Sequence, residues 1–129
     1  MWIRTAALLL ALMPAHAMAE ERPVTITVVN ATATPLECQA EAAHWYAFDL
    51  GIAQLNESLS IALLFEATTG TVGKPSHDGG MLPIETVYCG RAGQAYETRF
   101  VLPLRTLAAR GTVTVQCHVV RGAVACEGE

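Results

Sequence analysis

Four cysteines constrain the fold of this chain more than any other feature. They are Cys38, Cys89, Cys117 and Cys126. None of them has the Cys-x-x-Cys spacing that is typical of zinc sites. In an oxidising compartment an even set is most simply explained by two disulfides. Three pairings are possible for four cysteines, so the residues around each cysteine have to decide between them.

The last two cysteines lie in a predicted β-hairpin. Thr112–Val120 alternates apolar and polar residues, Arg121-Gly122 suits a two-residue turn, and Ala123–Cys126 follows. Counting out from this turn pairs Cys117 with Cys126 at a non-hydrogen-bonded position, where Cα atoms lie about 4.5 Å apart. That distance is at the short end of the range for a disulfide. The same register gathers the following residues on one face: Val113, Val115, Cys117, Val119, Val124 and Cys126.

We therefore predict the disulfide Cys117–Cys126, which leaves Cys38 to pair with Cys89. The second bridge closes a loop of roughly 50 residues and stabilises the fold by about 4 kcal/mol on the loop-entropy model. The competing arrangement pairs Cys89 with Cys117 and Cys38 with Cys126. It is less favoured because it ignores the hairpin geometry.

The first 19 residues have the layout of a secretory signal peptide. One early cation precedes the apolar run of residues 6–13, and the segment ends in the small-residue pattern Ala17-Met18-Ala19. Such a pattern predicts cleavage before Glu20. The apolar run is shorter than the roughly 20 residues that cross a bilayer. We therefore expect residues 20–129 to be a single domain, periplasmic or secreted, with no membrane span after cleavage.

The charge balance argues against nucleic-acid and lipid partners. The chain has 8 Lys and Arg residues against 12 Asp and Glu residues, and the predicted signal peptide contains one Arg and no acid. The remaining surface is mildly acidic and has no basic patch of the kind that binds nucleic acid or anionic lipid. We expect no nucleic-acid partner.

Further segments alternate in the manner of strands. They are Val24–Asn30, Ser58–Phe65, Pro83–Tyr88 and Tyr96–Leu102. Pro103 cannot donate to a sheet ladder and therefore marks a strand end or an edge. Thr68–Gly80 contains four glycines and mostly polar residues, which predicts a mobile loop.

Leu36–Leu50 is ambiguous between helix and strand. Leucine and alanine recur there at helical spacing, and alanine favours helix. The aromatic cluster that begins at Trp45 favours strand. We favour a strand at Trp45–Phe48.

Six or seven short strands separated by turns predict an all-β fold, a small antiparallel β-sandwich with two disulfides. This architecture resembles that of immunoglobulin-like domains, in the layering of strands alone. Trp45 follows Cys38 by seven residues and Tyr88 adjoins Cys89, and both spacings differ from those of true immunoglobulin domains. No functional residue is carried over.

The candidate catalytic and metal-binding residues do not form a recognisable set. His44, His77 and His118 would have to converge with Cys or Met to hold copper or zinc. His77-Asp78 could act as an acid–base pair, but no activated nucleophile accompanies it. There is no phosphate-binding loop and no serine elbow. We expect no metal, no cofactor and no enzymatic activity.

The best candidate for a binding surface is the aromatic group His44, Trp45, Tyr46 and Phe48. Strand alternation places Trp45 on the opposite face from the other three residues. One face then enters the core, where Trp45 is the favoured occupant, and the other face is available for recognition.

Three functional hypotheses follow in order of preference. The first is a small exported, non-catalytic binding or accessory module that docks to another exported protein or envelope component. The second is a periplasmic carrier of a metal or small ligand that uses His44, His77 or His118. The third is a small hydrolase that uses His77 and Asp78.

Overall fold

The computed structural model describes residues 21–43 and 46–128. The predicted signal peptide, His44 and Trp45 lie outside these residues. The described chain forms nine strands and one helix, in the order β1 (Glu21–Asn30), β2 (Leu36–Ala42), β3 (Tyr46–Ala53), β4 (Ser58–Glu66), β5 (Thr71–Pro75), β6 (Met81–Arg91), β7 (Phe100–Val101), α1 (Leu104–Arg110), β8 (Val113–Val120) and β9 (Ala123–Gly128).

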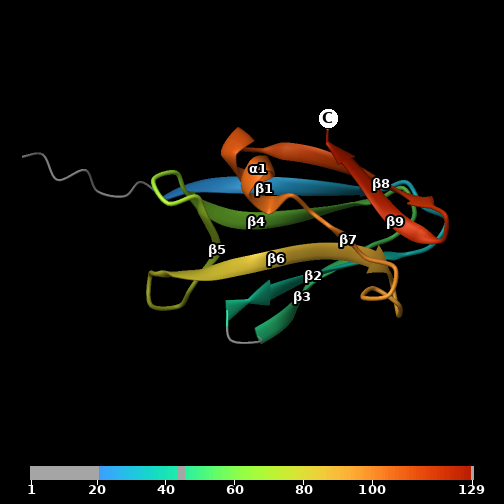
Figure 1. Ribbon diagram of the computed structural model, residues 1–129, viewed down its shortest axis with the longest axis horizontal. Helices are drawn as coiled ribbons and strands as arrows, with labels where there is room; N and C mark the ends of the chain where they lie inside the picture. Colours follow the sequence, from blue (N-terminus) through green and yellow to red (C-terminus); the bar gives the residue numbers. More distant parts are fainter. Residues whose placement is uncertain (1–20, 44–45, 129) are drawn as a thin grey trace, which may run out of the picture.

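The strands form one sheet that folds over on itself into two layers. Their order is β3-β2-β6-β5-β4-β1-β8-β9, and β7 pairs with β6. One layer contains β4, β1, β8 and β9, and the other contains β6, β2 and β3 (Figure 1). The predicted all-β sandwich is therefore confirmed. One pair departs from the antiparallel pattern, because β1 and β8 run parallel, as strands joined by a long crossover can.

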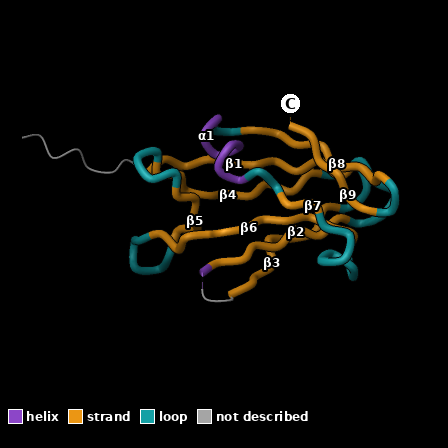
Figure 2. Tube along the Cα trace, in the orientation of Figure 1, coloured by secondary structure: helices purple, strands orange, loops and turns teal. Residues whose placement is uncertain are grey.

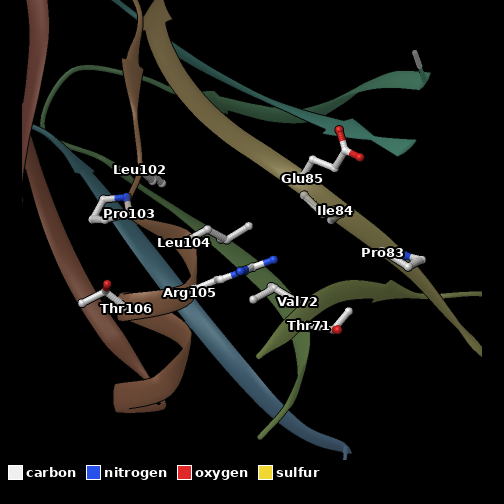
Figure 3. A pocket seen from close by; sticks show the side chains of 10 residues that line it. All are labelled: Thr71, Val72, Pro83, Ile84, Glu85, Leu102, Pro103, Leu104, Arg105 and Thr106. Carbon is white, nitrogen blue, oxygen red and sulfur yellow. The ribbon is translucent and has the colours of Figure 1, made fainter. Parts of the chain in front are cut away.

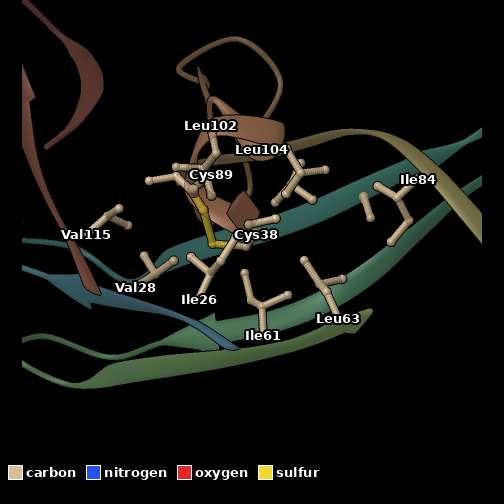
Figure 4. Packing of buried hydrophobic residues seen from close by; sticks show 14 of the residues in the cluster. Ile26, Val28, Cys38, Ile61, Leu63, Ile84, Cys89, Leu102, Leu104 and Val115 are labelled. Carbon is tan, nitrogen blue, oxygen red and sulfur yellow. A yellow bond between two sulfur atoms is a disulfide. The ribbon is translucent and has the colours of Figure 1, made fainter. Parts of the chain in front are cut away.

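The core lies between the two layers and follows the predicted alternation. Val24, Ile26 and Val28 of β1 are buried, while the residues between them are partly exposed. The disulfide between Cys38 and Cys89 lies among the apolar side chains of both layers (Figure 4).

Both predicted disulfides are present. Cys38 pairs with Cys89 and Cys117 with Cys126, each pair lying directly opposite in neighbouring strands, with Cα atoms 4.1 and 4.0 Å apart. The C-terminal hairpin has the predicted register. Its turn residues, Arg121 and Gly122, have φ angles of 53° and 81°, as a type I′ turn requires.

The helical interpretation of Leu36–Leu50 is wrong. β2 and β3 are strands that pair antiparallel to each other. In β2 every second residue, from Leu36 to Ala42, is buried. Ala40, one of the alanines that suggested a helix, is instead a small buried residue on the inner face of β2.

The interpretation of Thr68–Gly80 as a loop is also wrong, because it contains β5. The short strand lies between two tight turns and pairs with both β4 and β6. Sequence reasoning missed it because its composition is dominated by glycine and polar residues, which signal turns.

Tyr96–Leu102, predicted as a strand, is mostly a loop. Only Phe100–Val101 pairs with β6, while residues 95–98 form turns. Thr98 closes this loop, since its hydroxyl accepts the Arg91 N–H at 2.8 Å and donates to the Gln94 carbonyl at 2.7 Å. A threonine side chain that bonds to nearby backbone competes with strand pairing in this way.

The helix α1 was not anticipated from the sequence. It begins directly after Pro103, where β7 has already ended. Leu104, Leu107 and Ala108 are buried in the core cluster, at the spacing of one helical face. Seven residues are too few for a helical period to stand out in the sequence, so this helix depends on the sandwich that it covers.

Asn30 joins the end of β1 to the turn that follows β3. Its side chain is fully buried, and its Nδ2 donates to the carbonyls of Thr34 at 2.9 Å and Ala53 at 3.0 Å. Its Oδ1 accepts from the N–H and the hydroxyl of Thr32. These bonds hold the C-terminal end of β3 against the core.

Gly73 allows β5 to bridge the two layers. A Cβ at this position would lie 2.6 Å from the Leu82 carbonyl oxygen and would also overlap the Met81 side chain. Side chains can move, but the carbonyl belongs to the paired backbone of β6. The close approach of β5 and β6 therefore requires glycine.

We expect Gly73→Ala to lower the free energy of unfolding by about 1–3 kcal/mol, the usual cost of overpacking. Urea denaturation would measure the change. Gly80→Ala is the matched control, because its Cβ would meet no atom closer than 3.3 Å. Equal destabilisation by the two substitutions would show that the approach of β5 to β6 has no special role.

The two disulfides should differ in their contribution to stability. Their cysteines are 51 and 9 residues apart, and the loop-entropy model assigns about 4 kcal/mol to the longer loop and about 3 kcal/mol to the shorter one. Replacing Cys38 and Cys89 by alanine should therefore destabilise more than replacing Cys117 and Cys126. Urea denaturation of both double variants tests this, and the reverse order would contradict it.

Candidate functional site

The predicted aromatic residues that the structure describes lie on β3, at one end of the sheet order. Tyr46 lies opposite Ala42 and Phe48 opposite Ala40, so both aromatic residues face the inner side of the sheet. Tyr46 is nevertheless 70% exposed, whereas Phe48 packs against the core. In Figure 1, β3 is the strand of its layer that lies farthest from β1 and β4. Lys74 of β5 places its Nζ 4.9 Å from the centre of the Phe48 ring.

The side of β3 that faces away from β2, here called the β3 edge, carries backbone groups directed outward. The Cα distance of 4.1 Å between Cys38 and Cys89 identifies a non-hydrogen-bonded pair. The backbone of Cys38 therefore points toward β3, and alternation directs the N–H and C=O groups of Phe48 toward β2. The same alternation directs those of Ala47 and Asp49 outward.

The other end of the sheet is covered differently. At β9 the Val124 N–H donates to the Thr98 carbonyl at 2.8 Å, and β9 contacts β6 and β7 (Figure 2). Within the described residues, no comparable backbone bond reaches the outward groups of Ala47 or Asp49. A bulge at Leu50, which is unpaired between Asp49 and Gly51, ends the regular stretch of the β3 edge.

The outer face of β2 and β3 is acidic and tightly hydrogen-bonded; we call Glu37, Gln39, Glu41 and Asp49 the acidic face. The Gln39 Nε2 donates to Glu37 Oε1 at 2.7 Å and to Asp49 Oδ1 at 3.0 Å. Its Oε1 accepts the Tyr88 hydroxyl at 2.5 Å. Gln39 thus orients carboxylates on both strands.

Tyr88 lies under the acidic face, and the carboxylates of this face affect the pKa of its hydroxyl. Burial raises the pKa of the Tyr88 hydroxyl, and the carboxylates of Glu41 and Glu37 raise it further, because they disfavour a phenolate beside them. The ring of Tyr96 meets Tyr88 edge-on, with centroids 6.1 Å apart, and Arg99 stacks on Tyr96 at 3.9 Å. Tyr88 and Tyr96 therefore extend the outer surface of the sheet from β2 across β6.

A cleft of about 690 Å³ lies between β5, β6 and the start of α1, and sequence reasoning missed it. Val72, Ile84 and Leu104 contribute its apolar part, and Arg105 extends from α1 toward β6 (Figure 3). The Glu85 carboxylate points away from Arg105. Chemically, the cleft suits a small apolar group with an anionic substituent. The chain segments that form it meet only after folding, so no local pattern could reveal it.

The described histidines lie apart. His77 occupies the exposed turn between β5 and β6, whereas His118 lies on β8, 3.9 Å from a Glu127 carboxylate oxygen. In Figure 1 these regions lie at opposite ends of the sandwich. Among the described residues, no group of three or more His, Cys, Asp or Glu side chains could hold a metal ion.

The proposed acid–base pair His77-Asp78 is not assembled in this structure. The Asp78 carboxylate accepts the Ser76 hydroxyl and the Gly80 N–H within its own turn. These two bonds lower the pKa of Asp78, since they favour its charged form. Asp78 therefore stabilises the turn.

Comparison with known proteins adds no assignment, because the sequence matches no family and no curated protein or solved structure is similar to it.

The two disulfides indicate an oxidising, non-cytoplasmic location. No helix among the described residues is long and apolar enough to cross a membrane.

The raised pKa of Tyr88 predicts a dependence of stability on alkaline pH. The folded state holds the phenolic proton more tightly than the unfolded state does. The resulting contribution of Tyr88 to the free energy of unfolding is complete below about pH 10 and is lost as pH rises through the folded pKa. Absorbance titration of tyrosinate should show one component above the ordinary range. Tyr88→Phe should remove that component and Glu41→Gln should lower its pKa, whereas a single common transition near pH 10 would contradict the assignment.

Proposed function

We propose that the protein is a small exported, non-catalytic binding module that docks to another exported protein through the β3 edge. The observation that carries this proposal is the outward direction of the Ala47 and Asp49 backbone groups. An extended segment of a partner can pair with such groups and add a strand to the sheet.

The composition of β3 supports docking of this kind. Proteins usually protect an edge strand with lysine, proline or a covering segment. β3 contains neither lysine nor proline. The bulge at Leu50 is a protecting feature, but it leaves Tyr46–Asp49 regular. An exposed tyrosine at the start of this stretch provides the rigid amphipathic contact that is common at interfaces.

Two further observations fit an exported, non-catalytic role. All four cysteines are joined in disulfides, so the chain presents no thiol nucleophile. Disulfides of this kind persist in the periplasm or outside the cell. We accordingly expect the partner in the same compartment.

Photo-crosslinking in intact cells of the native host tests this proposal. A crosslinking amino acid at Ile52 of β3 should capture a partner, because this side chain is 52% exposed and lies beside the β3 edge. Ala47→Pro should reduce the adduct about tenfold, since it removes one outward N–H and introduces a ring that obstructs pairing. Proline is tolerated at this position because the lost N–H does not bond to β2.

The control position is Val120, which is 47% exposed at the C-terminal hairpin. Unchanged circular dichroism and intact disulfides would show that Ala47→Pro still folds. The same adducts at Ile52 and Val120, or an Ile52 adduct that survives Ala47→Pro, would overturn docking at the β3 edge.

A further inference from the structure

We infer that the segment that docks on the β3 edge is a strand of alternating basic and apolar residues. The basic residues lie beside the acidic face, and the apolar residues lie beside Tyr46 and Phe48. This inference rests on the proposed function and adds the chemistry of the partner. It follows from the difference between the two faces of the sheet at this edge.

The outer side of the edge favours cations. Asp49 is on β3, and Glu37 and Glu41 lie on the adjoining strand, on the same face. β2 and β3 contain no lysine or arginine that could neutralise these carboxylates. Gln39 holds two of them in place, so a lysine or arginine on an added strand meets an ordered acceptor. Burial contributes most to the raised pKa of Tyr88, but the carboxylates of Glu41 and Glu37 raise it further, while Arg99 lowers it.

The inner side of the edge favours apolar residues. Tyr46 is exposed there and Phe48 packs against the core. The Nζ of Lys74 already lies over the Phe48 ring, so a second cation on this side would be repelled. Because successive strand residues point to opposite faces, one added strand can satisfy both sides only by alternating basic with apolar residues.

A second copy of this chain fits the edge poorly. Two β3 strands paired antiparallel about a twofold axis would keep their outer faces on the same side of the joined sheet. The acidic faces of both copies would then adjoin each other, with Asp49 on both strands of the new pair. Like charges placed across a strand pair are destabilising. A basic partner removes this repulsion.

Binding of labelled synthetic peptides tests the inference. The probes are an alternating Lys-Val peptide, a Glu-Val peptide of equal length, and a block isomer with all lysines before all valines. Fluorescence anisotropy at low salt should show that Lys-Val binds about tenfold more tightly than Glu-Val. A difference of this size is what a few exposed ion pairs contribute together to the binding free energy. The block isomer should bind more weakly because it cannot alternate. Added salt should reduce the preference for Lys-Val.

Three variants assign the effect to the site. Asp49→Lys should reduce the preference for Lys-Val several-fold, whereas the matched reversal Glu127→Lys, on exposed β9, should leave it unchanged. Ala47→Pro should weaken binding of every alternating peptide, because edge pairing needs its N–H. Lys-Val binding that survives Ala47→Pro would show charge attraction alone and would overturn the inference.

The outcomes separate this inference from the proposed function. If Ala47→Pro abolishes the Ile52 adduct but Glu-Val binds as well as Lys-Val, docking at the β3 edge stands and the basic partner is wrong. If no adduct forms at Ile52 but Ala47→Pro abolishes Lys-Val binding, the preference of the β3 edge for an alternating basic and apolar strand stands, and docking to an exported partner in the cell does not. A dimer in analytical ultracentrifugation that Ala47→Pro dissociates would make a second copy the occupant and overturn the basic partner.

Discussion

The structure depends on β5, the five-residue strand that pairs with β4 on one side and with β6 on the other. This shared pairing folds one sheet into two layers and lets the apolar residues of both layers bury each other. The approach is possible because Gly73 has no side chain to meet the Leu82 carbonyl. Burial of apolar surface, the main stabilising term in folding, thus relies on a turn-rich segment of low hydrophobicity.

The two end strands of the sheet, β9 and β3, differ in how far other segments cover them, and the candidate site lies at the less covered strand, β3. At one end, the Thr98 carbonyl accepts a bond from the Val124 N–H of β9, while α1 covers part of the core between the layers. At the other end, Asn30 holds the end of β3 while the middle of that strand keeps its outward backbone groups. β3 is thus anchored at its end and, within the part of the chain that the structure describes, has no backbone partner along its outer side, so little ordering entropy would oppose the addition of another strand.

The acidic face makes the outer side of β3 negatively charged. Gln39 links carboxylates on two strands and is itself bonded to the buried Tyr88. A hydrogen-bonded network of this kind fixes side chains that would otherwise move freely at a surface. The proposed partner would therefore meet carboxylates that are already placed, so that binding would cost less side-chain ordering.

The sequence by itself determined the C-terminal hairpin with its disulfide, the all-β class and the inner face of β1, because each depends on alternation and turn residues that are close together. The Cys38–Cys89 disulfide then followed because only these two cysteines were left. The sequence predicted a loop where β5 lies and a strand at Tyr96–Leu102, where most residues form turns. It did not anticipate α1, and it left Leu36–Leu50 open between helix and strand, because short segments take their conformation from distant neighbours. It singled out Tyr46 and Phe48, yet the openness of their strand, the acidic face and the cleft were decided by the tertiary structure. The Thr98 loop bonds to β9 at one end of the sheet, whereas no described residue makes a comparable bond along β3 at the other end, and this packing joins residues far apart in the chain.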